Sequence, residues 1–90
     1  MIVIDVGNTN IVVGIYYRKK LNKIFRLHTE KNKKKFNLLF DNFLKSKKIE
    51  VLKKDNNICI LSSVVPTLNL QIKKIFLRKK FKFYRIDPNN

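Results

Sequence analysis

The sequence predicts an α/β fold: a mixed five-stranded sheet with helices packed on it, in the order β-β-β-α-β-α-β. Three apolar runs within the first 28 residues are separated by short polar turns, which is typical of strands joined by hairpins. After them, apolar residues at helical spacing alternate with short apolar runs, which is typical of crossover connections between parallel strands. A chain of 90 residues, 44% of them hydrophobic, has room for one domain with one core.

The first two predicted strands meet at a polar corner. Residues 2–7 form a nearly continuous apolar run, as expected for a strand that is covered on both faces. Residues 10–17 form the second strand, and the turn between the two contains Gly, Asn and Thr. One carboxylate, Asp5, lies close to the end of the first strand.

A third strand is predicted over residues 21–28, and a helix follows it. Apolar side chains recur at i, i+3, i+4, i+7 and i+8 from Phe36 to Leu44, which places them in one stripe along a helix. Asn32 is the candidate N-cap of this helix, because its side chain can accept a hydrogen bond from the first turn. Residues 49–57 then form a polar connection.

The second half of the chain predicts a strand, a helix and a final strand. Residues 58–61 form the fourth strand, in which Cys59 is expected to be a buried, inert thiol. Pro66 opens the second helix, at a position where its missing N–H costs nothing. Residues 81–86 form the fifth strand, and residues 87–90 have the composition of a turn.

The corner after the first strand has chemistry that suits a phosphate group. A buried strand that ends in a carboxylate is costly unless the charge has a partner, and Asp5 is a hard oxygen ligand suited to Mg²⁺, directly or through water. Gly7 lets the backbone approach a ligand and adopt a positive φ, and successive backbone N–H groups in such a turn can bind an anion. Asn8, Thr9 and Asn10 add amide and hydroxyl groups. The alternative for this turn is an ordinary hairpin with an Asx-type turn; the preceding carboxylate favours phosphate.

Three stretches of the chain resemble motifs of the type III pantothenate kinases, which belong to the actin, hexokinase and sugar-kinase superfamily. The run Ile4-Asp5-Val6-Gly7-Asn8-Thr9-Asn10-Ile11-Val12 is similar to the first phosphate motif of that family. The run Arg26-Leu27-His28-Thr29 resembles its Arg-Leu-x-Thr, and Leu61-Ser62-Ser63-Val64-Val65-Pro66 resembles its Ser-Ser-Val-Val-Pro. The resemblance covers essentially the whole chain but only the first part of the family's chain. It implies a ribonuclease-H-like half-domain with its last helix missing or trimmed.

The resemblance implies transfer of the γ-phosphoryl group of ATP to the 4′-hydroxyl of pantothenate, which gives 4′-phosphopantothenate in the first step of coenzyme A biosynthesis. The implied cofactors are Mg²⁺ or a similar divalent cation, held by Asp5, and a monovalent cation, K⁺ or NH₄⁺. The implied nucleotide-binding residues are Asp5, Val6, Gly7, Asn8, Thr9, Asn10, Ile11 and Val12, of which the last two would pack beneath the loop. Ser62 and Ser63 would line the cleft at the end of a strand, with a helix N-cap as the alternative.

By the same resemblance, the catalytic residues are expected in the part of the family's chain that lies beyond this sequence. That part carries the general base, a second Asp-centred phosphate loop, the ligands of the monovalent cation and most of the pantothenate pocket. We therefore assign no catalytic residue here. We expect residues 1–90 to form a single N-terminal nucleotide-phosphate-binding domain of a truncated or split enzyme, with a C-terminal half or a homodimer as partner. A non-catalytic remnant that binds nucleotide weakly is the alternative.

The charge of the chain is unusually positive, with 21 Lys and Arg against six Asp and Glu and a net charge of +15. Such a charge suggests nucleic acid or an anionic surface as a partner. Seventeen of the basic residues are Lys, which lacks the fork of Arg, and they are spread over nearly every connection. We interpret the charge mainly as composition bias and keep a basic nucleic-acid-binding module as the alternative. No apolar run approaches the roughly 20 residues of a membrane span and no signal-peptide pattern is present, so a cytoplasmic location is expected.

Overall fold

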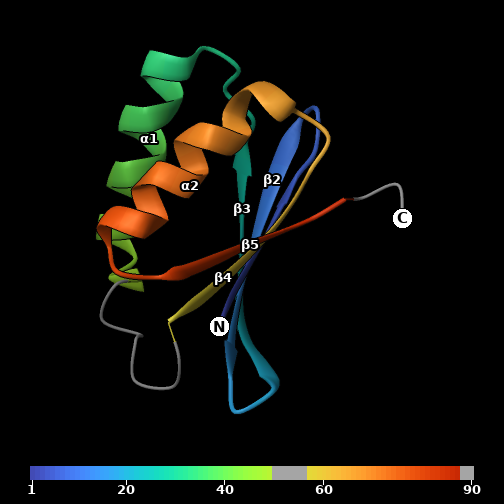
Figure 1. Cartoon of the computed structure of the whole chain (residues 1–90), viewed down its shortest axis with the longest axis vertical. Helices are drawn as coiled ribbons and strands as arrows, with labels where there is room; N and C mark the ends of the chain where they lie inside the picture. Colours follow the sequence, from blue (N-terminus) through green and yellow to red (C-terminus); the bar gives the residue numbers. More distant parts are fainter. Residues whose placement is uncertain (50–56, 88–90) are drawn as a thin grey trace.

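The structure, a computed structural model, describes residues 1–49 and 57–87. Five strands form one sheet in the order β3-β2-β1-β4-β5, in which β1 pairs antiparallel with β2 and parallel with β4 (Figure 1). The strands are β1 (Ile2–Val6), β2 (Asn10–Tyr17), β3 (Lys20–His28), β4 (Ile58–Ser63) and β5 (Lys82–Ile86). The α/β class, the mixed five-stranded sheet and the order of the elements are therefore confirmed.

Two α-helices cover one face of the sheet, α1 (Lys33–Ser46) and α2 (Asn69–Arg78) (Figure 1). The side chain of Asn32 accepts a hydrogen bond from the N–H of Lys35 at 3.1 Å, which confirms it as the N-cap of α1. Pro66 opens a 3-10 turn, η2 (Pro66–Leu68), which leads directly into α2. Of the helical stripe predicted for α1, Phe36, Phe40 and Leu44 are buried and Phe43 is partly buried, whereas Leu39 at its edge is 55% exposed.

The core lies between this helical layer and the sheet. In α1 and α2 the rings of Phe40 and Phe76 meet edge-on, with their centroids 6.3 Å apart. Cys59 is also fully buried here, and burial raises the pKa of its thiol to about 12, as expected for an inert cysteine. None of the helices that the structure describes has the length and apolarity needed to cross a membrane.

The opposite face of the sheet is not covered by the described part of the chain. The sequence pattern predicts that both faces of β1 are buried, but the structure buries only Ile2, Ile4 and Val6, whereas Val3 is half-buried and Asp5 is exposed. The prediction is wrong because both described helices pack on the same face. Apolar side chains on the open face remain about half exposed, among them Ile24, Tyr84 and Ile86.

Helix α2 ends in a Schellman turn. The N–H of Phe81 donates to the carbonyl of Phe76 and the N–H of Lys80 donates to that of Leu77, both at 3.0 Å. The rings of Phe81 and Phe76 also pack edge-on, with centroids 5.2 Å apart. This arrangement satisfies carbonyls that the helix leaves open. The residue at its left-handed position is Lys80, with φ 67°.

The remaining sequence predictions concern connections. Most of the predicted polar connection at 49–57, and most of the predicted turn at 87–90, lie outside the described residues. Ile49 itself is fully buried, so the connection begins with a core residue rather than a polar one. The fourth strand continues to Ser63, two residues further than predicted, because β1 offers pairing partners up to Val6.

Candidate functional site

The sheet order brings the end of β4 next to the polar corner between β1 and β2. Because β4 runs parallel to β1, the carboxyl ends of both strands lie side by side. The register pairs Asp5 with Ser62 on one side and with Val12 of β2 on the other. Paired residues share a face of the sheet, so these three side chains lie in one row across the open face.

Asp5 projects from this row as an exposed carboxylate. Its neighbours along the strand, Ile4 and Val6, point into the core, and the alternation of the strand therefore turns Asp5 outward. Among the described residues it forms no ion pair. The carboxylate thus stays free to accept a cation, and the hydroxyl of Ser62 stands next to it.

The backbone of the corner is close-packed at Gly7. Its N–H donates to the carbonyl oxygen of Asn10 at 2.9 Å, and a Cβ at Gly7 would lie only 3.1 Å from that same oxygen. The positive φ predicted for Gly7 is wrong, since neither glycine adopts one in the described structure. Glycine suits this position, because any side chain would require the Asn10 carbonyl to move by a few tenths of an ångström.

The three residues after Gly7 are exposed at the edge of the sheet. Asn8, Thr9 and Asn10 reach solvent, and the Asn10 side-chain amide donates to the Thr9 hydroxyl at 3.4 Å. Ile11 is fully buried in the core beneath the corner, whereas Val12 points to the opposite face, beside Asp5. The two apolar residues assigned to support the loop therefore lie on different faces.

Thr29 holds the corner from the neighbouring strand, a role for which the sequence reasoning did not single it out. It follows directly on β3, and only 3% of its surface is exposed. Its hydroxyl donates to the carbonyl of Gly7 at 2.8 Å and its N–H donates to the carbonyl of Thr9 at 2.9 Å. The signal in the sequence is the hydroxyl that ends the third strand, but its partner lies 22 residues away.

The two serines of β4 have different surroundings. Ser62 is half-buried on the open face beside Asp5. Ser63 points into the core side, where its hydroxyl donates to the carbonyl of Val65 at 3.2 Å and accepts from the N–H of Val65 at 3.1 Å. The N-cap alternative is contradicted, because no side chain caps the 3-10 turn or α2. Ser63 instead closes the turn that precedes them.

A shallow hollow of about 310 Å³ lies beside the corner, at the carboxyl ends of β4 and β5. Its walls include Ser63 of β4, Asn69 of α2 and Arg85 of β5, together with residues of the β4–α2 connection. The N–H of Val64 donates to the carbonyl of Val6 at 3.0 Å, which ties this connection to the end of β1. In sheets of this kind, ligands bind outside the carboxyl ends of parallel strands.

Charged side chains on the open face of the sheet near the corner include Asp5 and Arg26. Arg26 is exposed on β3 and pairs in register with Val12 of β2. Val12 therefore lies between Arg26 and Asp5 in the row across the sheet. Within the described ranges no three His, Cys, Asp or Glu side chains gather as a metal site. A divalent cation at this corner would therefore have one carboxylate ligand, Asp5, and would need its other ligands from water and a bound phosphate.

Comparison with known proteins yields one family. A family model described as type III pantothenate kinase matches residues 1–89. A type III pantothenate kinase of Citrifermentans bemidjiense is 34% identical over 90 residues, which are 98% of this chain and 33% of the relative. A type III pantothenate kinase of Geotalea uraniireducens is 36% identical over 91 residues, which cover 98% of this chain and 35% of the relative. One of Brevibacillus brevis is 35% identical over 77 residues, which cover 83% of this chain and 29% of the relative. The chain spans about a third of the length of the curated relatives it matches.

Proposed function

The chain belongs to the type III pantothenate kinase family, and from this premise we propose that it is the nucleotide-phosphate-binding part of a pantothenate kinase. The complete enzyme transfers the γ-phosphoryl group of ATP to the 4′-hydroxyl of pantothenate, the first step toward coenzyme A. Residues 1–90 act as one N-terminal domain of this enzyme, in the cytoplasm. The chain covers about a third of the length of its relatives, and in this proposal the remainder of the enzyme completes the site.

The observation that carries this proposal is the exposed carboxylate of Asp5 beside a backbone corner that is held rigidly by hydrogen bonds. Phosphoryl transfer depends on positioning and on neutralising charge, and needs little covalent chemistry from the protein. The corner supplies the positioning, because backbone N–H groups after Gly7 and the side chains of Thr9 and Asn10 can contact phosphate oxygens, whereas the Gly7 N–H is already bonded to the Asn10 carbonyl. Asp5 supplies a ligand for the cation that accompanies them.

The donor set at the corner fits Mg²⁺. This ion prefers oxygen ligands, keeps several waters, and is usually bound through one or two carboxylates together with substrate phosphates. The structure offers one exposed carboxylate, Asp5, and one neighbouring hydroxyl, Ser62. Bound there, the ion would neutralise phosphate charge. Asp5 would orient it, and Ile11 would hold the loop against the core.

The other parts of the reaction lie in the remainder of the enzyme. The general base that accepts the proton of the 4′-hydroxyl, the site for K⁺ or NH₄⁺ and most of the pantothenate pocket are placed there. Ser62 and the hollow at the carboxyl ends of β4 and β5 would face this remainder across the cleft. The proposal therefore predicts phosphate binding by the chain alone and phosphoryl transfer only with its complement.

Complementation tests the proposal. The chain is mixed with a separately expressed C-terminal two-thirds of the Citrifermentans bemidjiense relative, together with ATP, Mg²⁺, K⁺ and pantothenate. We expect 4′-phosphopantothenate, detected by mass spectrometry, and its loss with Asp5→Ala. The matched control is Asp41→Asn, which removes a carboxylate from α1 at a distance from the corner. If the two folded parts associate and no product forms, the split-enzyme proposal is refuted.

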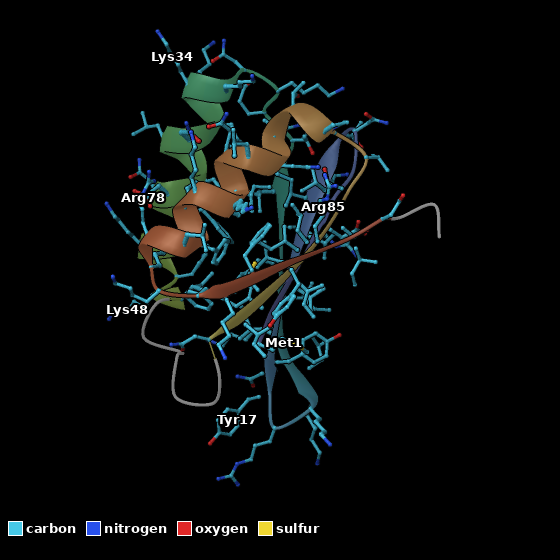
Figure 2. All side chains as sticks on the ribbon, viewed as in Figure 1. Met1, Tyr17, Lys34, Lys48, Arg78 and Arg85 are labelled. Atoms are coloured by element: carbon cyan, nitrogen blue, oxygen red, sulfur yellow. The ribbon has the colours of Figure 1, made fainter. Side chains whose placement is uncertain are left out.

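The two alternatives make different predictions. A non-catalytic remnant would bind ATP and Mg²⁺ weakly in calorimetry and would give no product on complementation. A nucleic-acid-binding module would bind with a steep salt dependence that Asp5→Ala leaves unchanged. The four basic residues labelled in Figure 2 belong to different elements: Lys34 lies on α1, Lys48 after it, Arg78 on α2 and Arg85 on β5.

A further inference from the structure

We propose that Thr29 is a positioning residue for the phosphate-binding corner, a role that rests on the proposed function. Thr29 and Ser63 are the two buried polar residues in the described part of the chain. The hydroxyl of Ser63 is used within its own turn, whereas both donors of Thr29 reach the corner between β1 and β2. Thr29 therefore joins the end of an edge strand to the loop that is expected to bind phosphate.

The two hydrogen bonds decide which way the loop's N–H groups point. A trans peptide unit is planar, so the N–H of each residue points opposite to the carbonyl before it, and the described chain has no cis peptide bond. The Gly7 carbonyl is held on the Thr29 side by the hydroxyl, and the Thr9 carbonyl by the Thr29 N–H. The N–H groups of Asn8 and Asn10 are consequently both turned to the side away from Thr29.

Both N–H groups thus lie on the same side of the loop, where we expect them to contact an anion. A third bond, from the Gly7 N–H to the Asn10 carbonyl, closes the loop. Every carbonyl from Gly7 to Asn10 except that of Asn8 is thus held by a donor of the protein. Carbonyl oxygens repel phosphate, so holding them away from it is as necessary as presenting the N–H groups.

Removing only the hydroxyl tests this role. Thr29→Val keeps the shape of the side chain and the backbone N–H but loses the bond to the Gly7 carbonyl. Thr29→Ser keeps the hydroxyl. Ser46→Ala is the matched control, since the Ser46 hydroxyl also donates to a backbone carbonyl, that of Phe43 at 2.9 Å, but lies at the end of α1.

The experiment follows backbone amide signals of the isotope-labelled full chain by NMR at physiological salt. Without ligand, we expect Thr29→Val to speed hydrogen exchange at the Gly7 amide, and Thr29→Ser and Ser46→Ala to leave it near the wild-type rate. With ATP and Mg²⁺, we expect shifts at Asn8 and Asn10, and about tenfold weaker binding for Thr29→Val, the effect of one lost hydrogen bond. Thr29→Ser should restore binding to within about twofold.

The outcomes separate this inference from the proposed function. If wild type shows no shifts at the corner with ATP and Mg²⁺, the phosphate site fails, and the exchange rates still decide whether Thr29 orders the loop. If Thr29→Val exchanges and binds like wild type, the positioning role is refuted. Should Thr29→Val unfold, the same comparison is made in the Lys80→Gly background, because glycine relieves the left-handed backbone at the end of α2 and is expected to stabilise the fold. An equal loss of binding in Ser46→Ala would also refute the inference.

Discussion

The end of α2 provides a quantitative test of the backbone argument, because a lysine occupies the left-handed position of the Schellman turn. A non-glycine residue in this conformation costs roughly 1–2 kcal/mol, and Lys80 has φ 67°. Glycine removes that cost but loses more conformational freedom on folding, which offsets roughly 0.5–1 kcal/mol. We therefore expect Lys80→Gly to raise the free energy of unfolding by about 0.5–1 kcal/mol, or roughly 2–8 °C in Tm.

Two matched variants isolate the cause of this gain. Lys80→Ala removes the same charge but keeps a Cβ, so it should gain little. Lys74→Gly places glycine at an exposed position inside the same helix and should lose about 1 kcal/mol. Urea unfolding monitored by circular dichroism gives all three values on one scale. If Lys80→Gly is no more stable than Lys80→Ala, the gain does not come from the left-handed backbone and the reasoning is wrong.

Two further predictions concern the helical layer. Burial disfavours the ionised form of the Asp41 carboxyl group. Hydrogen bonds and charge from Lys45 and Lys79, at 3.1 and 3.3 Å, outweigh this effect and lower the pKa of Asp41 below 3.8. Folding therefore favours the ionised form, so the contribution of Asp41 to the free energy of unfolding is complete above pH ~5 and disappears as the pH falls below 3.8. Asp41→Asn should weaken the loss of stability between these pH values, measured by urea unfolding at a series of pH values. An unchanged pH dependence would contradict the assignment. Phe40→Ala, in the centre of the core, should cost about 3–5 kcal/mol in urea unfolding, whereas Leu38→Ala, which is 65% exposed, should change stability by less than about 0.5 kcal/mol.

The sequence was informative wherever structure depends on neighbours along the chain. The spacing of apolar residues from Phe36 to Leu44 predicts α1, and the structure buries most of this stripe but leaves Leu39 exposed. Asn32 could be identified as its cap because a capping side chain acts three residues away. The polar corner could also be located, because Asp5 and the turn after it are adjacent in sequence.

Predictions that depend on contacts across the sheet were less successful. The sequence could not show which face of β1 the helices cover, so it predicts two buried faces where the described structure has one. It assigned Gly7 a positive φ, although the constraint is the carbonyl of Asn10. It placed Ser62 and Ser63 together, and the pleat of β4 points them to opposite faces.

The amino-acid sequence by itself determined the class of the fold, the type of each element and the chemistry gathered at the first corner, because periodicity, capping and turn composition act over a few residues. Only the tertiary structure decided that Ser62 stands beside Asp5 and that Thr29 holds the loop from 22 residues away. Both contacts follow from strand order and register. These are set when the whole sheet packs against its helices, and no local pattern encodes them.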